Sequence, residues 1–300
     1  MPQTPSRTLS NHEKALLQIR SVPRPQAQSA ARKRAKAKSQ GQTESPLALT
    51  RRARKINRIL AQTYPYAVAE LDFDNPYQLL VATVLSAQTT DVRVNSVTPH
   101  LFDRYPQPAD LAAARQEDVE DLVRPLGFYR NKASAIIRLA AALHQNHQGQ
   151  VPQRLEDLVK LPGVGRKTAF VVLSNAFGQP GLTVDTHFGR LARRLGFTQQ
   201  EDPVKVEKEV AALFPPKDWA GLSHHLVYQG RRICHAQRPA CGACPIADLC
   251  PSYGIGEEDE QKAAALLKYE LAPGREELHL LFLQGASRRQ LQAQGYPLSA

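Results

Sequence analysis

The feature that most restricts how this chain can fold is a group of four cysteines near residue 240. They are the only cysteines in 300 residues, and their spacing is C-x6-C-x2-C-x5-C. Disulfides usually join distant parts of small secreted domains, whereas clustered thiols in a reducing compartment are typical of metal ligands. The loop that carries them must therefore wrap around one centre. The four residues are Cys234, Cys241, Cys244 and Cys250.

The spacing alone is compatible with a zinc ion or an iron–sulfur cluster. Structural zinc sites usually use two C-x2-C pairs, and this loop has one, so the asymmetry favours a cubane (4Fe-4S) cluster. Pro239, Gly242 and Pro245 supply the turns that wrapping requires. Nearby cations offset the negative charge of thiolates and cluster. These cations are Arg231, Arg232 and Arg238.

Helical periodicity dominates the chain from residue 51 onward. Ile56, Ile59, Leu60 and Tyr64, for example, fall on one helical face. Pro or Gly separates the segments, and no two alternating segments are joined by a hairpin turn. The sequence therefore predicts an all-α fold. Further helices are predicted at 79–87, 108–115, 116–124, 130–147, 154–160, 166–177, 187–195, 203–214 and 218–232.

The positive charge is concentrated in the first 58 residues. They contain 14 Lys and Arg against 2 Asp and Glu, whereas the remainder contains 25 against 26. A net charge of +11 indicates a polyanionic partner, attracted at long range by the N-terminal arm. The sequence has no apolar run long enough for a membrane span and no secretory signal, so we expect a soluble intracellular protein without a membrane partner.

The two ends differ from the body in composition. Residues 1–50 are rich in Ser, Gln, Pro and basic side chains, with RKRAKAK at 32–38, and we expect a disordered arm apart from a short helix near 13–20. The basic run fits a nuclear address, a transit peptide or a tail on DNA phosphates, and a solvated arm with weak nonspecific DNA affinity is the simplest interpretation. Residues 253–300 begin with an acidic, Ala-rich helical segment and show no chemistry.

The motif LPGVGRKTA at 161–169 lies between two helical patterns. Pro162, Gly163 and Gly165 permit a tight turn, and the next helix begins near Arg166. Backbone N–H groups at a helix start form an anion site, so a nucleic-acid phosphate can dock there without contact to base edges. An ordinary helix–helix turn explains the motif equally well.

Lys167 departs from a local rule, because a cation in the first turn of a helix opposes the helix dipole. Such departures often mark function. The dipole and the adjacent Arg166 disfavour the ammonium form, as a nucleophilic, Schiff-base-forming lysine requires. Taken alone, an exposed lysine that contacts a phosphate or nothing is the simpler interpretation.

Asp185 begins the run Asp-Thr-His, directly before another helical pattern. Thr186 is a natural N-cap, and a carboxylate at a helix start should stay ionised. A capping role is the competing explanation for Asp185. An amine, a stable carboxylate, a phosphate-docking hairpin and a thiolate cluster together form a much narrower constellation than any one of them.

With these residues in place, the sequence resembles the endonuclease III family, iron–sulfur DNA glycosylases of the helix-hairpin-helix superfamily. The match covers about 200 residues, from 51 to 252, in the order that the family uses, and the arm and tail lie outside it. The matching segments are LSAQTTDVRVN (85–95), GFYRNKA (127–133), LPGVGRKTA (161–169), VDTH (184–187) and the four cysteines.

The resemblance implies two helical lobes that flank a DNA-binding cleft. We place a six-helix barrel with the helix-hairpin-helix motif at 70–183. The iron–sulfur cluster domain combines 51–69 with 184–252. Residues 1–50 remain the disordered basic arm, and 253–300 are a C-terminal tail of unknown role.

The resemblance also implies an activity. The family excises oxidised pyrimidines, such as thymine glycol, from duplex DNA and then cleaves the abasic site. Lys167 would attack C1′ of the flipped nucleotide, and Asp185 would assist base departure and proton transfer. The iminium acidifies the C2′ proton, so β-elimination breaks the 3′ phosphodiester without a metal ion. This predicts a bifunctional DNA glycosylase and AP lyase of base excision repair, with a structural 4Fe-4S cluster.

DNA contacts follow from the same resemblance. Gln88 would fill the hole left by the flipped base, and Phe128 would be a wedge on the opposite strand. The simpler interpretations are a polar residue at a helix end for Gln88 and a core aromatic for Phe128. The remaining predicted DNA contacts are Gly163, Gly165, Arg166 and His187, although ordering of the turn is the alternative for His187. Further phosphate contacts from the cluster loop are Arg231, Arg232 and Arg238, for which solvated charges are the simpler interpretation.

Two other functions remain as rivals. An adenine-mismatch glycosylase shares the hairpin, aspartate and cluster loop, but it lacks a lysine at the place of Lys167 and carries a large extra C-terminal domain. A noncatalytic DNA-binding module needs neither Lys167 nor Asp185. We expect a monomer that binds double-stranded DNA with an oxidised pyrimidine or abasic site. The preferred location is the bacterial cytoplasm at the nucleoid, although the arm also suits a nuclear or mitochondrial protein.

Overall fold

The computed structural model describes residues 44–268, 275–286 and 291. Among these residues every regular element is a helix, so the predicted all-α fold is confirmed. The predicted helix near 13–20 lies outside the described residues. The α-helices are α3 (Pro46–Thr63), α4 (Pro76–Leu85), α5 (Asp91–Arg104), α6 (Pro108–Ala112), α7 (Gln116–Val123), α8 (Tyr129–His147), α9 (Leu155–Leu158), α10 (Arg166–Ala176), α11 (Thr186–Arg194), α12 (Pro203–Ala211), α13 (Trp219–Arg232), α14 (Glu260–Ala264) and α15 (Arg275–Leu283).

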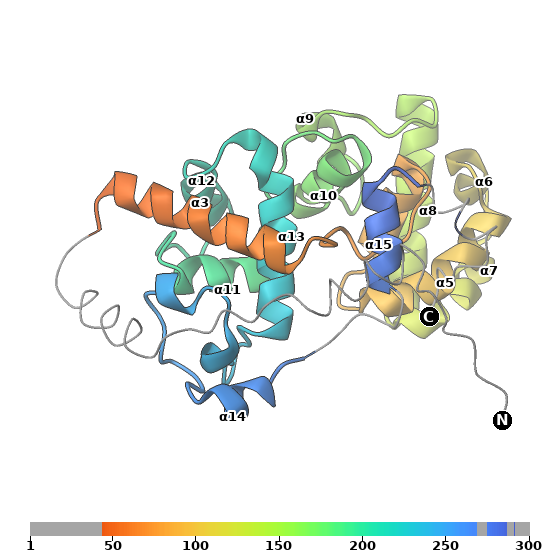
Figure 1. The fold of residues 1–300 in the computed structure, drawn as a ribbon. Coiled ribbons are helices and arrows are strands. Elements are labelled where there is room, and N and C mark those ends of the chain that lie inside the picture. Colours follow the sequence, from red (N-terminus) through yellow and green to blue (C-terminus); the bar gives the residue numbers. More distant parts are fainter. Residues whose placement is uncertain (1–43, 269–274, 287–290, 292–300) are drawn as a thin grey trace, which may run out of the picture.

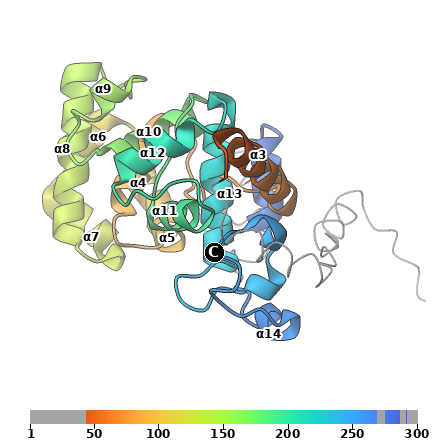
Figure 2. The same cartoon turned by 90° about the vertical axis from the view of Figure 1, so that its left-hand side faces the viewer.

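The helices pack around two large hydrophobic cores. The first core is built by α4 to α10 and contains buried side chains from Leu71 to Leu173. The second joins α3 to α11, α12, α13 and the cysteine loop. Figures 1 and 2 show α3 beside α13, with α6 to α8 on the other side of the molecule. From α3 in the second core, the chain crosses to the first core for α4 to α10 and then returns to the second core. The two segments that make these crossings, of which 67–73 is the first, lie where the cores meet.

The predicted end of the arm at residue 50 is wrong, because 46–50 form the first turn of α3. The Ser45 side chain accepts a hydrogen bond from the backbone N–H of Ala48, and Pro46 occupies the first helical position. Leu49 packs against the second core. A good cap and one apolar contact therefore outweigh the composition of the preceding segment.

The described segments of the tail, 253–268 and 275–286, pack onto the rest of the fold, which the sequence did not reveal. The Glu257 N–H donates to Pro239 O at 2.9 Å, and the Gly242 N–H donates to Glu257 O at 2.8 Å, so residues 253–258 brace the cysteine loop. In α14, Ala263 is buried against Ile233 and Ala240. The first part of the tail therefore completes the cluster region.

The second part of the tail, α15, is tied to a segment about 200 residues earlier. Both terminal nitrogens of the Arg275 guanidinium donate to the Asp72 carboxylate at 3.0 Å, and one of them also donates to Glu70 O at 2.9 Å. His279 Nδ1 lies 3.2 Å from the Tyr228 hydroxyl on α13. Helix α15 thereby joins the crossing segment 67–73 to α13 (Figure 1).

Replacing Arg275 by Met is expected to lower the free energy of unfolding by about 3 kcal/mol, because it leaves the Asp72 carboxylate buried without its partner. Urea unfolding measures this loss. The double variant Asp72→Leu, Arg275→Met should recover much of it. The exposed Arg115→Met is the matched control. An effect of Arg275→Met no larger than that of Arg115→Met would show that α15 is not held by this ion pair.

Candidate active site and metal centre

A cavity of about 430 Å³ lies between the two cores. One wall is the face of α10 that carries Lys167 and Val171, and the facing wall is α13. The segment 68–71 and the turn after α4 complete it. Lys167, Asp185 and Gln88 all line this one cavity. The structure therefore brings together three predicted site residues from distant parts of the sequence.

Lys167 is the second residue of α10, directly after the predicted hairpin. Gly163 has a φ of 76°, a conformation that favours glycine, and Gly165 is the N-cap of α10. Val164 is buried in the first core between the two glycines. The hairpin is thus anchored by its apolar residue, and Lys167 emerges at the start of a fixed helix.

Asp185 both caps a helix and lines the cavity. It is the N-cap of α11, and its Oδ1 accepts a hydrogen bond of 2.7 Å from the Phe188 N–H. Thr186, the predicted cap, is instead the first helical residue. Because the cap holds the carboxylate by one oxygen, Oδ2 is left for another partner. The capping explanation is therefore right, and it is compatible with a chemical role.

Asp185→Asn separates these two roles, because asparagine is as good an N-cap as aspartate. We expect a normal unfolding free energy. For the base-release activity that the resemblance implies, we expect a rate lower by roughly a hundredfold or more, as for the loss of a proton-transferring group. Asp185→Ala should also lose about 1 kcal/mol of stability. Single-turnover base release and urea unfolding measure both. A fully active Asp185→Asn enzyme would assign the residue to capping alone.

Gln88 and Phe128 lie on neighbouring loops, each with a backbone conformation that is rare outside glycine. Their φ angles are 55° and 48°. Thr89 Oγ1 donates to Leu126 O at 2.7 Å, and Lys132 Nζ donates to the same oxygen at 3.0 Å, so the two loops are fastened together. The Phe128 side chain is 66% exposed, which contradicts its interpretation as a core aromatic. Strain at exposed residues of this kind is typical of functional loops.

Two predicted DNA contacts are engaged within the protein. Arg166 makes two hydrogen bonds to the Glu207 carboxylate, at 2.8 and 2.7 Å, and thereby ties α10 to α12. His187 Nδ1 lies 3.2 Å from Arg190 Nη2. DNA binding by Arg166 or His187 therefore stays a prediction. To bind DNA, each side chain would have to exchange its contact with Glu207 or Arg190 for one with the nucleic acid.

The arginines at the end of α13 also depart from expectation. Arg232 is buried, donates to the Tyr66 hydroxyl at 2.8 Å and lies over the Tyr228 ring at 4.6 Å, so it is a core residue and no phosphate contact. Arg231 lines the cavity and pairs with Glu70 at 2.9 Å and Asp91 at 3.5 Å. Sequence reasoning missed the α13 wall. Its only signal is the spacing of polar residues three and four apart from 224 to 231.

The four cysteines surround a single small pocket, with apolar residues and Arg194 as the other walls. Arg194 Nη1 donates to Cys234 Sγ, and Gln229 Nε2 donates to Cys244 Sγ, each at 3.2 Å. The loop is closed tightly, because a Cβ added at Gly242 would lie 2.4 Å from Glu258 O. Donors directed at sulfur favour thiolate ligands.

The donor set fits an iron–sulfur cluster better than one ion. In the part of the chain that the structure describes, no three Cys, His or carboxylate side chains form a group that could hold a single metal ion, although four cysteines surround one pocket. A zinc ion needs all four sulfurs about 2.3 Å from one point, whereas a cluster holds them further apart. Burial raises the pKa of the Cys250 thiol to about 11 and also raises that of Cys244, so bound iron is needed to keep these groups as thiolates.

Comparison with known proteins agrees with this geometry. Residues 81–216 match the HhH-GPD superfamily base excision DNA repair proteins, and residues 234–250 match the iron–sulfur binding domain of endonuclease III. Fold and site therefore define a helix-hairpin-helix base excision repair protein with a 4Fe-4S cluster.

Individual relatives narrow the class. The chain is 50% identical to endonuclease III of Synechocystis sp. over 202 residues, which are 67% of this chain and 92% of the relative. For endonuclease III of Bacillus subtilis the identity is 44% over 192 residues, 64% of this chain and 88% of the relative. The chain belongs to the endonuclease III family, and its expected class, a bifunctional DNA glycosylase and AP lyase, is confirmed.

Two solved structures show the same fold with DNA. A non-covalent endonuclease III–DNA complex has a TM-score of 0.65 and 44% identity, and covers 68% of this chain and 95% of its own. A trapped covalent endonuclease III–DNA intermediate, an estranged-adenine complex, has the same TM-score and identity, and covers 68% and 96%. Among the described residues no helix is long and apolar enough to span a bilayer.

Proposed function

We propose that this enzyme removes oxidised pyrimidines from duplex DNA and cleaves the resulting site through an imine on Lys167. The observation that carries the proposal is that Lys167 and Asp185 line one cavity between the two cores, in a chain of this family. A related endonuclease III has been captured covalently bound to DNA. A covalent bond of this kind is expected when a nucleophilic group of the enzyme attacks the sugar.

The chemistry needs no group beyond these two side chains. The neutral Lys167 amine attacks C1′ of the flipped nucleotide, the C1′–N bond breaks, and the base leaves with a proton. Asp185, held by the Phe188 N–H, accepts the proton that the amine loses. Asp185 passes this proton to the departing base. The C1′–O4′ bond of the sugar then breaks, O4′ takes up a proton from water, and the nitrogen lone pair forms the C1′=N iminium. The iminium acidifies C2′, and loss of that proton expels the 3′ phosphate. Water finally releases the lysine. The cluster shapes the DNA-binding loop and takes no part in these steps.

The remaining assignments are proposals of the same account. Gln88 and Phe128 enter the duplex from their fastened loops, and the hairpin amides at Gly163 and Gly165 bind a phosphate. Arg166 and His187 lie at the edge of this contact. The protein acts as a monomer in the bacterial cytoplasm, at the nucleoid.

We also propose the two lobes as domains. The barrel domain is 70–183, and the cluster domain is 51–69 with 184–252. Each contains one of the two large cores, apart from residues at the boundaries. The bracing of the cysteine loop by 253–258 supports adding that segment to the cluster domain.

Lesion choice is tested with duplexes that carry thymine glycol, 5-hydroxycytosine, 8-oxoguanine or no lesion. We expect base release and a β-elimination product from the two oxidised pyrimidines, and little from the others. Preference for the purine would contradict the proposed substrate. Base release without strand cleavage would instead favour a monofunctional enzyme.

Deletion of residues 1–43 tests the proposed role of the arm. These residues contain 9 Lys and Arg against 1 Glu, and the cut leaves the Ser45 cap intact. Each phosphate contact contributes about 0.9 to the magnitude of the slope of log K against log salt. If the arm makes about three such contacts, its deletion weakens nonspecific binding and lowers the magnitude of the slope by about 3. Cleavage at low salt should not change. An unchanged slope would mean that the arm does not touch DNA.

A further inference from the structure

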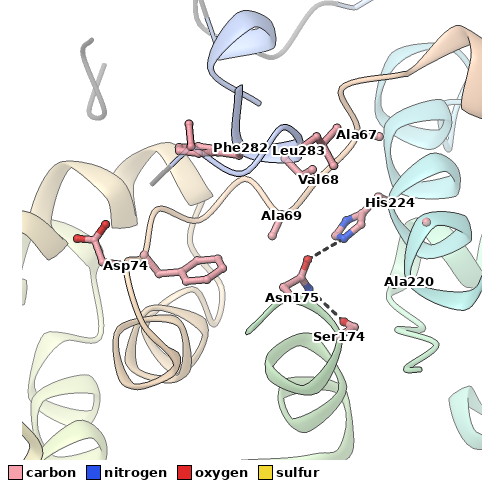
Figure 3. Close-up of a pocket in the computed structure, with 13 residues that line it drawn as sticks. Ala67, Val68, Ala69, Asp74, Ser174, Asn175, Ala220, His224, Phe282 and Leu283 are labelled. Atoms are coloured by element: carbon pink, nitrogen blue, oxygen red, sulfur yellow. Dashed lines mark hydrogen bonds between the residues drawn. The ribbon is translucent and has the colours of Figure 1, made fainter. Parts of the chain in front are cut away.

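The groove between α10 and α13 continues past the catalytic cavity into a second one. This second cavity, of about 480 Å³, shares four wall residues with the first and is bordered by Phe282 and Leu283 at the end of α15 (Figure 3). The shared residues are Val68, Ala69, Asn175 and His224. Along α10, Asn175 lies eight residues, or about 12 Å, beyond Lys167. The two cavities therefore follow one another along the groove.

A hydrogen bond between Asn175 and His224 marks the boundary. Asn175 Nδ2 donates to Val171 O at 2.8 Å and to Ser174 Oγ at 3.1 Å, so its Oδ1 must accept from His224 Nε2, at 2.9 Å (Figure 3). Burial lowers the pKa of His224 to about 4, so the imidazole is neutral at pH 7. A single neutral hydrogen bond is readily exchanged for one to an incoming polar group.

The walls of the second cavity suit a small planar heterocycle. Most are apolar, among them Ala67, Val68, Phe73, Phe282 and Leu283. A few polar groups, among them Ser174 and Asn175, lie at the boundary with the first cavity. Binding sites for small molecules have this composition and a volume of ~300–1,000 Å³.

The reaction creates a ligand of this kind in the neighbouring cavity. Once the C1′–N bond breaks, the sugar is bonded to Lys167 and the duplex covers the entrance, so the base is separated from solvent on that side. Resting on the proposed function, we propose that the second cavity, bordered by α15, is a binding site for the released pyrimidine base. The base passes the Asn175–His224 pair and occupies it while the strand is still attached to Lys167.

Direct titration tests this proposal. Free 5,6-dihydrothymine is titrated into the full-length holoenzyme, alone and saturated with a duplex that contains a tetrahydrofuran abasic analogue, which cannot form an imine. We expect binding in both cases. Absence of binding at about 10 mM, a concentration that detects even very weak sites, would overturn the proposal. Binding that the duplex abolishes would also overturn it, because the base would then occupy only the catalytic cavity.

Variants locate the site. Ala220→Phe and Ala286→Phe each place a large side chain among the residues that line the second cavity, and each should weaken base binding at least about tenfold. The exposed Ala109→Phe on α6 is the matched control and should bind normally. The absorbance of the iron–sulfur cluster reports whether each variant folds. One folded cavity-filling variant is enough for the test. Full affinity in a folded variant would contradict the assignment.

Borohydride trapping of the wild-type enzyme on an abasic duplex separates this proposal from the function on which it rests. Trapping without base binding would sink the second site and leave the lyase mechanism intact. Absence of trapping would sink the mechanism itself, and with it the reason for a base site.

Discussion

Replacing Lys167 by Gln is expected to abolish strand cleavage at abasic sites, with a single-turnover rate at least roughly a thousandfold lower. The amide cannot form the imine, and the cavity offers no second lysine among its lining residues in the described chain. Glutamine keeps the length of the side chain and a polar end. DNA affinity should therefore fall little, because the hairpin that presents residue 167 is anchored by Val164.

The matched control is Lys160→Gln, a 73% exposed lysine on the other side of the hairpin. It should cleave as the wild type does. Normal cleavage by Lys167→Gln would show that another group attacks C1′. A variant that still releases the base but never cleaves the strand would indicate that water can replace the amine in the first step.

Cys244→Ser is expected to have the largest effect on stability. Cys244 packs against both the second core and the small cluster of Ile233, Ala240 and Ala263, so iron held by its thiolate would join the loop to the body. Loss of a structural metal centre removes folding free energy directly. We expect colourless, poorly folded protein with a lower urea midpoint.

Ala243→Ser is the matched control, because it introduces the same serine hydroxyl at the position next to Cys244. It should keep the cluster, since its side chain is no ligand. Iron and sulfide analysis with absorbance spectra measure cluster content in both variants. A stable wild-type protein that contains one equivalent of zinc and no iron would contradict the assignment of the centre.

The parts of the structure that sequence reasoning predicted correctly carry local signals. The glycine hairpin and the cysteine spacing each depend on residues a few positions apart. The position of Asp185 at a helix start was also correct, although the cap was assigned to Thr186 instead. Neighbouring cap candidates differ by one residue, and only the hydrogen bond to Phe188 distinguishes them.

The parts that could not be predicted depend on distant contacts. Arg275 and Asp72 are 203 residues apart, and nothing in the tail's composition announces a buried ion pair. From the sequence, Arg232 resembles a surface cation. In the structure it is surrounded by three tyrosine rings, and the hydroxyl of one of these tyrosines accepts a hydrogen bond from it. The left-handed conformation of Gln88 is equally invisible, because loop geometry imposes it on a residue that does not favour it.

The most direct test of the account is to identify the atom that bonds to DNA. The enzyme is incubated with a thymine glycol duplex and borohydride, the reduced adduct is digested, and the modified peptide is sequenced by mass spectrometry. The account predicts one adduct, on Lys167, and none in Lys167→Gln. An adduct on any other residue, or base release with no adduct, would contradict it.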